Sequence, residues 1–318
     1  MSQITSDLNQ PAASHRIDWR GVALVLISAI AFSAKAIFVK LAYRHSVDAL
    51  TLLTLRMVFA LPLFALAAWW AGRGQAVKTL QRNEWLSLIA LGLLGYYAAS
   101  LFDFLGLQYV SAALERLVLF LNPTFVVVLT ALFFGYRIVR RDVFALVVSY
   151  LGIVLVFLND LGAGQRDVAL GAGLVLLSAL CYSGYLVGAG QMVHRIGSLR
   201  FSAYALIVST TGVFVHFAAT REIALLAQPA PVLWLSLAMA VISTVLPVIL
   251  MAEGMRRIGP GNASMLGSIG PVATIFMGYL FLGEPVTVIQ IAGAFLVLLG
   301  VLAISLKKKL AVAAVESE

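Results

Sequence analysis

Charged residues are scarce in this chain, and only 11% of its 318 residues are Asp, Glu, Lys or Arg. A soluble globular domain carries about 25%. Hydrophobic residues make up 62% of the chain, against about 45–50% in soluble domains. A soluble core could not bury this much apolar surface. The composition therefore excludes an ordinary soluble enzyme or binding domain and predicts that a lipid bilayer surrounds most of the chain.

Cysteine and catalytic motifs are also nearly absent. The chain has one cysteine, Cys181, which excludes an intramolecular disulfide and any metal site built from several cysteines. It has no GxxxxGK[ST] phosphate-binding loop, no HExxH pair and no serine nucleophile elbow. We therefore expect no enzyme, no catalytic residue, no metal and no cofactor. Any transport must be driven by the substrate gradient, by exchange or by ions.

Long apolar runs fill most of the sequence. A membrane-spanning helix needs about 20 apolar residues, and short loops between neighbouring runs make successive helices antiparallel. The sequence therefore predicts an all-α polytopic membrane protein with ten transmembrane helices. The expected helices are 20–41, 48–70, 84–107, 111–134, 142–159, 170–192, 199–220, 231–252, 262–282 and 287–306.

Lys and Arg residues are distributed unevenly among the expected loops, and they explain the net charge of +8. Cytoplasmic loops of membrane proteins collect these residues, so the basic charge indicates orientation and no nucleic-acid partner is expected. With the N-terminus in the cytoplasm, four of these basic residues fall outside: Lys40, Arg44, Arg166 and Arg221. Fifteen fall inside: Arg16, Arg20, Arg73, Lys78, Arg82, Arg137, Arg140, Arg141, Arg195, Arg200, Arg256, Arg257, Lys307, Lys308 and Lys309. This bias predicts a multi-pass protein of the cell (inner) membrane with both termini cytoplasmic.

An internal repeat relates the two halves of the chain. The stretch Gly106 to Gly135 returns as Gly254 to Gly283 when one copy is moved by 148 positions. That offset aligns Gly106 with Gly254, Pro123 with Pro271, and Gly135 with Gly283. A repeat of this length indicates two halves of one fold rather than a short solenoid array.

Five crossings separate the two copies, so they point in opposite directions through the bilayer. We expect a cytoplasmic tail at 1–19, a first five-helix repeat at 20–159, an inverted second repeat at 170–307 and a second cytoplasmic tail at 308–318. Inverted repeats are typical of transporters, in which one half rocks against the other around a central site.

The ten expected spans and two phrases, SAALERLVLFLNPTFVVVLTALFFG from residue 111 and LGEPVTVIQIAGAFLVLLGVLAI from residue 282, resemble the drug/metabolite transporter superfamily, EamA type. The resemblance covers about residues 20–307. It implies a secondary carrier that exports small metabolites and has cytoplasmic termini. The halves differ at the end of the repeated stretch, where Tyr136 and Arg137 stand in place of Glu284 and Pro285, so the two halves are not interchangeable.

Five ionisable residues fall inside expected spans: Lys35, Arg56, Asp103, Glu115 and Arg116. A charge at the centre of an inserted helix costs about 2.5–3.5 kcal/mol, so each should face a partner or a wet cavity. All five lie in the outer half of the first repeat, which predicts a polar vestibule open to the outside. Purely structural roles are the alternative: Asp103 neutralising Lys35 or Arg116, and the N-terminal helix dipole stabilising Glu115.

Helical spacing adds polar candidates for the cavity wall. Tyr96, Ser100 and Asp103 share one face at i, i+4 and i+7, and Glu115 shares a face with Asn122. On the sixth span, Ser178 shares a face with Tyr182 and Tyr185, whose alternative role is aromatic packing between helices. Ser268 lies three residues before the second repeated proline.

The repeated prolines predict bends. Pro123 frees the carbonyl of Leu119 and Pro271 frees that of Gly267, and in a bilayer those carbonyls need a partner or water. A bend beside the cavity and simple helix curvature are both compatible with the sequence.

The sequence therefore favours a secondary transporter that exports a small polar or amphipathic metabolite, amino-acid-like or drug-like, by alternating access. Three cations against two acids mildly favour an anionic or zwitterionic substrate. The expected partners are that substrate and the lipid bilayer, with protons as a candidate coupling ion carried by Glu115 or Asp103. Monomer and homodimer are both compatible with the sequence. The alternative function is an intramembrane enzyme or sensor that uses the Asp103 and Glu115 cluster.

Overall fold

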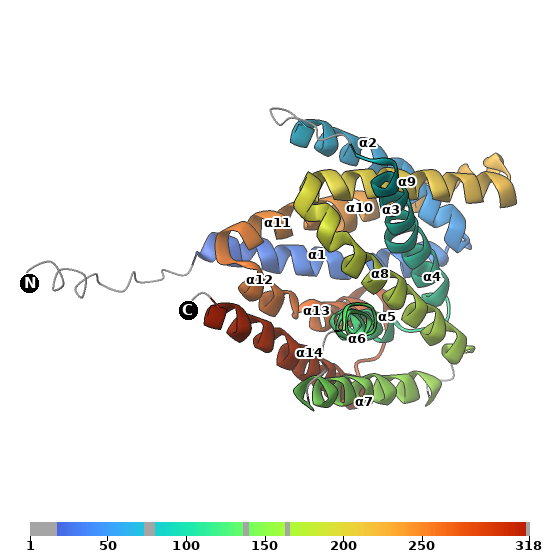
Figure 1. Ribbon diagram of the computed structural model, residues 1–318. Helices are drawn as coiled ribbons and strands as arrows, with labels where there is room; N and C mark the ends of the chain where they lie inside the picture. The colour runs from blue at the N-terminus through green and yellow to red at the C-terminus, as the bar shows by residue number, and fades with distance from the viewer. Residues whose placement is uncertain (1–17, 73–79, 136–139, 163–165, 316–318) are drawn as a thin grey trace, which may run out of the picture.

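A computed structural model describes residues 18–72, 80–135, 140–162 and 166–315 (Figure 1). Most of the first expected tail and the last three residues of the second lie outside these ranges. All regular structure in the described ranges is helical. The first repeat contains α1 (Trp19–Tyr43), α2 (Ala49–Gly72), α3 (Arg82–Gly92), the π-helix η2 (Leu93–Ala98), α4 (Ala99–Gly106), α5 (Ala112–Leu119), α6 (Asn122–Phe134) and α7 (Arg140–Gly162).

The second repeat follows the same order, with an extra 3₁₀ turn, η3, and an extra π-helix, η5. It contains α8 (Val168–Ile196), α9 (Ser198–Thr220), the 3₁₀ helix η3 (Ile223–Leu226), α10 (Ala230–Ala240), the π-helix η4 (Val241–Val245), α11 (Leu246–Ile258), α12 (Pro260–Gly267), α13 (Gly270–Met277), the π-helix η5 (Gly278–Leu282) and α14 (Val288–Val315).

Nine helical runs in the described ranges are long and apolar enough to cross a bilayer, and α14 adds a tenth, shorter apolar stretch at Val288–Leu302. The chain is thus an all-α polytopic membrane protein, as its sequence predicts. The helix α14 continues to Val315, beyond the expected end of the last span at residue 306. Figure 1 shows α1 beginning and α14 ending at the same end of the bundle. We call this the near end, and the end where α1 stops at Tyr43 the far end.

The two repeats share local irregularities at the same offset of 148. The π-helix η2 interrupts the third span from Leu93, and η4 interrupts the eighth from Val241. The fourth span breaks between α5 and α6, and the ninth breaks between α12 and α13. Gly135 and Gly283, which follow these two spans, both adopt left-handed backbone conformations, with φ of 68° and 72°, a conformation that glycine adopts without strain.

Serines on the first helix of each repeat bond to the other repeat at equivalent places. Ser28 Oγ on α1 donates to the carbonyl of Pro247 at 2.8 Å, and Ser178 Oγ on α8 donates to that of Ala99 at 2.7 Å. Both acceptors lie within two residues of the end of a π-helix. One turn further on, Ser33 Oγ donates to the carbonyl of Gly270 and Ser183 Oγ to that of Asn122. Each repeat is therefore stabilised by the first helix of the other.

Close helix packing follows the same symmetry. A Cβ atom on Gly106 of α4 would lie 2.5 Å from Val175 Cγ2 of α8. A Cβ atom on Gly254 of α11 would lie 2.5 Å from Val25 Cγ2 of α1. The helices α7 and α14 contact each other at one edge of the bundle, and α2 and α9 contact each other across from them (Figure 1). This arrangement leaves α1 and α8 beside the broken spans, where the polar residues gather.

Candidate substrate cavity

Lys35 binds two buried carboxylates. Its Nζ lies 2.5 Å from Asp103 Oδ2 and 2.9 Å from Glu115 Oε1, and these acids are 2% and 0% exposed. Ser111 sets the start of α5 as its N-cap, because its Oγ accepts from the backbone N–H of Leu114. This cap places Glu115 in the first turn, facing α1. The three side chains form one ion-paired cluster across α1, α4 and α5, which we call the Lys35 triad.

Arg56 on α2 has a different environment. Its Nη2 donates to Ser100 Oγ at 2.9 Å, and its guanidinium lies over the ring of Phe104 at 5.0 Å. The residue is 6% exposed, and its Nε has no hydrogen-bond partner. A cation–π contact and one hydroxyl therefore stabilise a buried charge, which leaves one N–H available to another ligand.

Arg116 follows Glu115 but points elsewhere, because successive side chains on a helix differ in direction by about 100°. Its guanidinium lies 5.8 Å from the ring centre of Phe120 and packs against the backbone of Gly270. Its Nε has no hydrogen-bond partner. Among the residues that the structure describes, no carboxylate lies within ion-pair distance of it. Arg116 therefore has no acidic partner in the described part of the chain.

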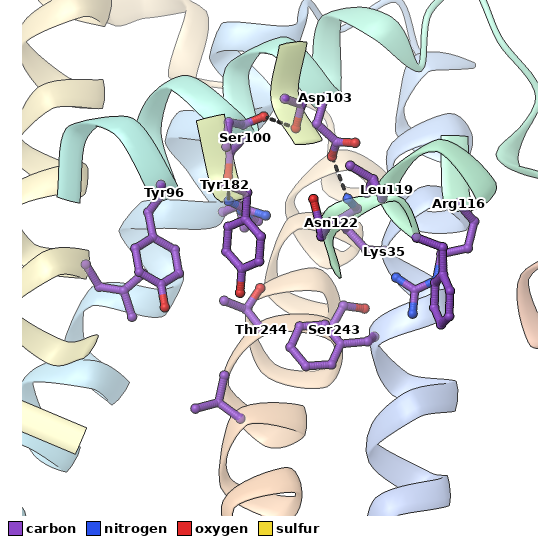
Figure 2. Close-up of a pocket in the computed structure, with 18 of the residues that line it drawn as sticks. Lys35, Tyr96, Ser100, Asp103, Arg116, Leu119, Asn122, Tyr182, Ser243 and Thr244 are labelled. Carbon is purple, nitrogen blue, oxygen red and sulfur yellow. Dashed lines mark hydrogen bonds and ion pairs between the residues drawn. The ribbon is translucent and has the colours of Figure 1, made fainter. Parts of the chain in front are cut away.

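A cavity of about 390 Å³ adjoins these residues. Figure 2 shows Tyr96, Tyr182, Ser243 and Thr244 around the space beside the Lys35–Asp103 pair, with the side chain of Arg116 turned toward the same space. Ten of the candidates selected from the sequence lie in its wall: Lys35, Arg56, Tyr96, Ser100, Asp103, Arg116, Asn122, Pro123, Ser178 and Tyr182. The wall takes residues from both repeats.

Four other candidates lie away from this wall. Glu115 is behind it, because the break between α5 and α6 removes the shared face expected with Asn122. Tyr185 packs against the rings of Tyr96, Tyr182 and Phe201. Ser268 donates to the carbonyl of Met265. Pro271, like Pro123, lies in the first turn of the helix that resumes after its break, where proline is well tolerated. Each break therefore precedes its proline.

Equivalent positions of the two repeats meet across the cavity. With offsets of 148 or 150, six pairs have both members in the wall: Phe32 with Tyr182, Arg56 with Leu206, Gly95 with Ser243, Tyr96 with Thr244, Ser100 with Val248, and Arg116 with Ser264. The approximate two-fold axis that relates the inverted repeats therefore passes through the cavity.

The cavity extends toward the near end of the bundle, contrary to the outward vestibule expected from the sequence. Its wall continues to Ser264, which is exposed in the second turn of α12, and to Val301 in the middle of α14. The far end is closed instead. There Lys40 Nζ lies 2.8 Å from Glu284 Oε1 and donates to the carbonyl of Val110.

Comparison with known proteins identifies the fold. The model of the EamA-like transporter family matches the chain twice, over residues 19–158 and 169–306. The chain belongs to the EamA-like transporter family. A relative from Bacillus subtilis (strain 168), "Uncharacterized transporter YcbK", is 32% identical over 288 residues, which cover 86% of this chain and 88% of that protein.

Other EamA-like relatives are more distant. The "S-adenosylmethionine/S-adenosylhomocysteine transporter" of Chlamydia trachomatis serovar L2 is 26% identical over 224 residues, covering 64% of this chain and 65% of that protein. A solved crystal structure superposes with a TM-score of 0.61 at 17% identity, over 90% of this chain and 96% of that one. That likeness supports the fold alone. Family and relatives together support a transporter role for this EamA-like chain.

Several residues of the site were missed by sequence reasoning. Ser243 and Thr244 line the cavity from the π-helix of the eighth span, and Gly270 makes room for Arg116. The offset of 148 places Thr244 opposite Tyr96, so the repeat itself contained this signal. Within the described ranges, no group of three or more His, Cys, Asp and Glu residues could hold a metal ion.

Proposed function

We propose that the chain is a secondary carrier that exports a small polar or amphipathic metabolite across the cytoplasmic membrane by alternating access. One observation carries the proposal: a single cavity is lined by equivalent residues of two inverted repeats. Such symmetry allows one set of helices to close one end while its counterpart opens the other. The closed far end and the cavity that reaches toward the near end match one of the two states that this mechanism requires.

The chemistry of the wall supports a small amphipathic substrate. Aromatic rings from Phe32, Phe64 and Phe120 supply apolar surface, while the charged groups and the hydroxyl and amide groups supply polar contacts. The Chlamydia relative is named for two metabolites that combine charged and aromatic parts. We extend to this chain only that general class of small amphipathic metabolite.

Energy for export must come from gradients, because the sequence has no phosphate-binding loop. We propose protons as the coupling ion, with Glu115 or Asp103 as the carrier. Both acids share one cation, Lys35, so a proton on one of them leaves the other paired. Loss and gain of that proton would change the contacts between α1, α4 and α5.

The orientation proposed from the basic residues puts the near end in the cytoplasm. A full-length protein with a green fluorescent protein on either terminus should fluoresce, and alkaline phosphatase at the same positions should be inactive. Active phosphatase at one terminus would contradict the proposed orientation.

Counterflow in proteoliposomes tests the carrier function. Vesicles with the full-length protein are loaded with pooled unlabelled amino acids and organic acids, and labelled members of the pool are added outside. We expect at least one labelled compound to accumulate transiently in the vesicles. Thr244→Trp fills the cavity and should abolish this accumulation. Elution of the variant as a single species in size-exclusion chromatography is the control for its folding. Chemical conversion of the label without accumulation would favour the enzyme alternative, in which Asp103 and Glu115 act on a substrate.

A further inference from the structure

The charges around the cavity lie on one side. Among the described residues, every charged side chain in the wall belongs to the first repeat. At equivalent positions the second repeat has Leu206 opposite Arg56 and Ser264 opposite Arg116. Hydroxyl groups occur on both sides, but formal charge does not. The cavity therefore has a charged wall, formed by α1, α2, α4 and α5, and an uncharged wall, formed by the second repeat.

The charged wall has an excess of one positive charge. Counted together with Glu115 directly behind it, this wall has three cations, Lys35, Arg56 and Arg116, and two anions, Asp103 and Glu115. Both anions bind Lys35 at 2.5 and 2.9 Å, so neither arginine has a carboxylate of its own there. An occupant with one negative charge would neutralise the wall, whereas a zwitterion would leave the excess unchanged. A buried charge is costly unless it is paired.

We propose that the cavity binds an amphipathic organic monoanion, with its carboxylate or comparable acidic group on Arg116 and its apolar body against the uncharged wall. This inference rests on the proposed carrier function and names the substrate class. A guanidinium presents parallel N–H donors that match a carboxylate in two places. Both arginines have an Nε without a hydrogen-bond partner, but Arg56 already donates to Ser100 through its Nη2, so Arg116 is the principal ligand.

The structure holds Arg116 in position through a glycine. A Cβ atom on Gly270 would lie 2.6 Å from Arg116 Nη2 and 3.2 Å from its Nε, so any larger residue would displace the guanidinium. The carbonyl of Gly270 accepts from Ser33 Oγ on α1, which fixes this part of the break between α12 and α13. The ring of Phe120 stacks near the guanidinium. Gly270 is thus a positioning residue for the anion site.

A series of compounds with one body and four head groups tests the proposal. The probes are 3-phenylpropionate, L-phenylalanine, phenethylamine and 3-phenylpropanamide, with octyl and indolyl analogues of each. Binding to the purified full-length protein in nanodiscs is measured from the shift in its thermal unfolding midpoint with probe concentration. We expect the anion to bind most tightly for at least one body. Equal or tighter binding of the zwitterion or cation, or no binding by any probe, would overturn the proposal.

Three variants separate the effect of the guanidinium's position from the effect of its charge. We expect Arg116→Gln to weaken anion binding by roughly 10- to 100-fold, as for loss of a hydrogen bond to a charged group, with little change for the neutral amide. The affinity of Arg116→Lys for the anion should fall between those of the unmodified protein and of Arg116→Gln. Gly270→Ala keeps every charge but displaces the guanidinium, so it should also reduce the preference for the anion. Arg221→Gln, a change to an exposed arginine far from the cavity, is the matched control. An anion preference that survives in both Arg116→Gln and Gly270→Ala would refute the assignment.

Failure of this inference differs from failure of the carrier function. Counterflow of zwitterions or cations without anion preference would leave the carrier in place and remove the monoanion site. Charge-selective binding without counterflow would keep the site and remove the carrier function.

Discussion

Lys40 and Glu284 join the two repeats at the far end of the bundle, where Lys40 Nζ lies 2.8 Å from Glu284 Oε1. Glu284 also accepts from the backbone N–H of Ala112 at the start of α5. The sequence equivalents of Lys40 and Glu284 in the other repeat are Gly190 and Tyr136, two residue types that cannot form an ion pair. The Lys40–Glu284 pair is therefore not duplicated by the repeat, and it favours the conformation with the far end closed.

Replacing Glu284 with Gln should shift the conformational equilibrium toward an open far end. The side chains of Lys40 and Glu284 are 21% and 17% exposed, so the pair is screened in part, and its loss should cost about 1–3 kcal/mol. We expect the open population to rise about five-fold or more. Spin labels on His45→Cys and Val286→Cys in a Cys181→Ser background would report the open population as a longer distance in pulsed electron–electron double resonance.

The matched control for this experiment is Glu253→Gln. Glu253 pairs with Arg256 and Arg257 within the second repeat, so its neutralisation should leave the far-end distance unchanged. An unchanged distance in Glu284→Gln would mean that the ion pair does not contribute to closure.

Two equivalent glycines should be sensitive to the same substitution. Gly106→Ala would place a Cβ atom 2.5 Å from Val175 Cγ2 and 2.9 Å from the carbonyl oxygen of Gly171. Gly254→Ala would meet Val25 Cγ2 at 2.5 Å, but the nearest backbone atoms are 3.3 Å away. We expect both variants to lose about 1–3 kcal/mol, with the larger loss at Gly106 because backbone moves less easily than a side chain.

Unfolding in mixed micelles with increasing dodecyl sulfate would measure these losses. Gly173→Ala on α8 is the control, since nothing lies within 4 Å of its Cβ position, and it should be neutral or slightly stabilising. Equal stability of all three variants would show that the close packing of α4 on α8 and of α1 on α11 is not a stability determinant.

The fold could be predicted from the sequence because each of its signals is local or periodic. Apolar runs set the helices, and the offset of 148 that aligns Pro123 with Pro271 revealed the repeat. The same offset relates residues that line one cavity, such as Arg116 and Ser264. The buried charges were also predicted to find partners, and Asp103 meets Lys35.

The direction of the cavity could not be predicted in this way. Depth along a helix says how far Lys35 lies from each surface, but the packing of other elements decides which end is open. The closure by Lys40 and Glu284 joins residues 244 positions apart, which no local pattern contains. An unbroken helical period would put Glu115 and Asn122 on one face, as the sequence predicts. The break between α5 and α6 interrupts that period and separates the two side chains.

Proton coupling can be separated from substrate exchange. Glu115→Gln should abolish uptake driven by a proton gradient in proteoliposomes while counterflow continues, because the substituted amide cannot carry the proton but still fits the same buried space. If Glu115 is the carrier, Asp103→Asn should reduce proton-driven uptake less than Glu115→Gln does. If Asp103 is the carrier, Asp103→Asn should reduce it more. Unchanged proton-driven uptake in both variants would exclude these two acids as the carrier.

The Lys35 triad should respond to substitution as one unit. Lys35→Met leaves Asp103 and Glu115 buried without a cation, and removal of one partner from a buried ion pair costs about 3–5 kcal/mol. The triple variant Lys35→Met, Asp103→Asn, Glu115→Gln leaves no unpaired charge among these three residues, so it should be closer to the unmodified protein in stability than Lys35→Met alone. Dodecyl sulfate titrations of both variants measure this non-additivity. Additive losses would show that the three side chains contribute independently, so that the charge of one acid would not depend on the cation that it shares with the other.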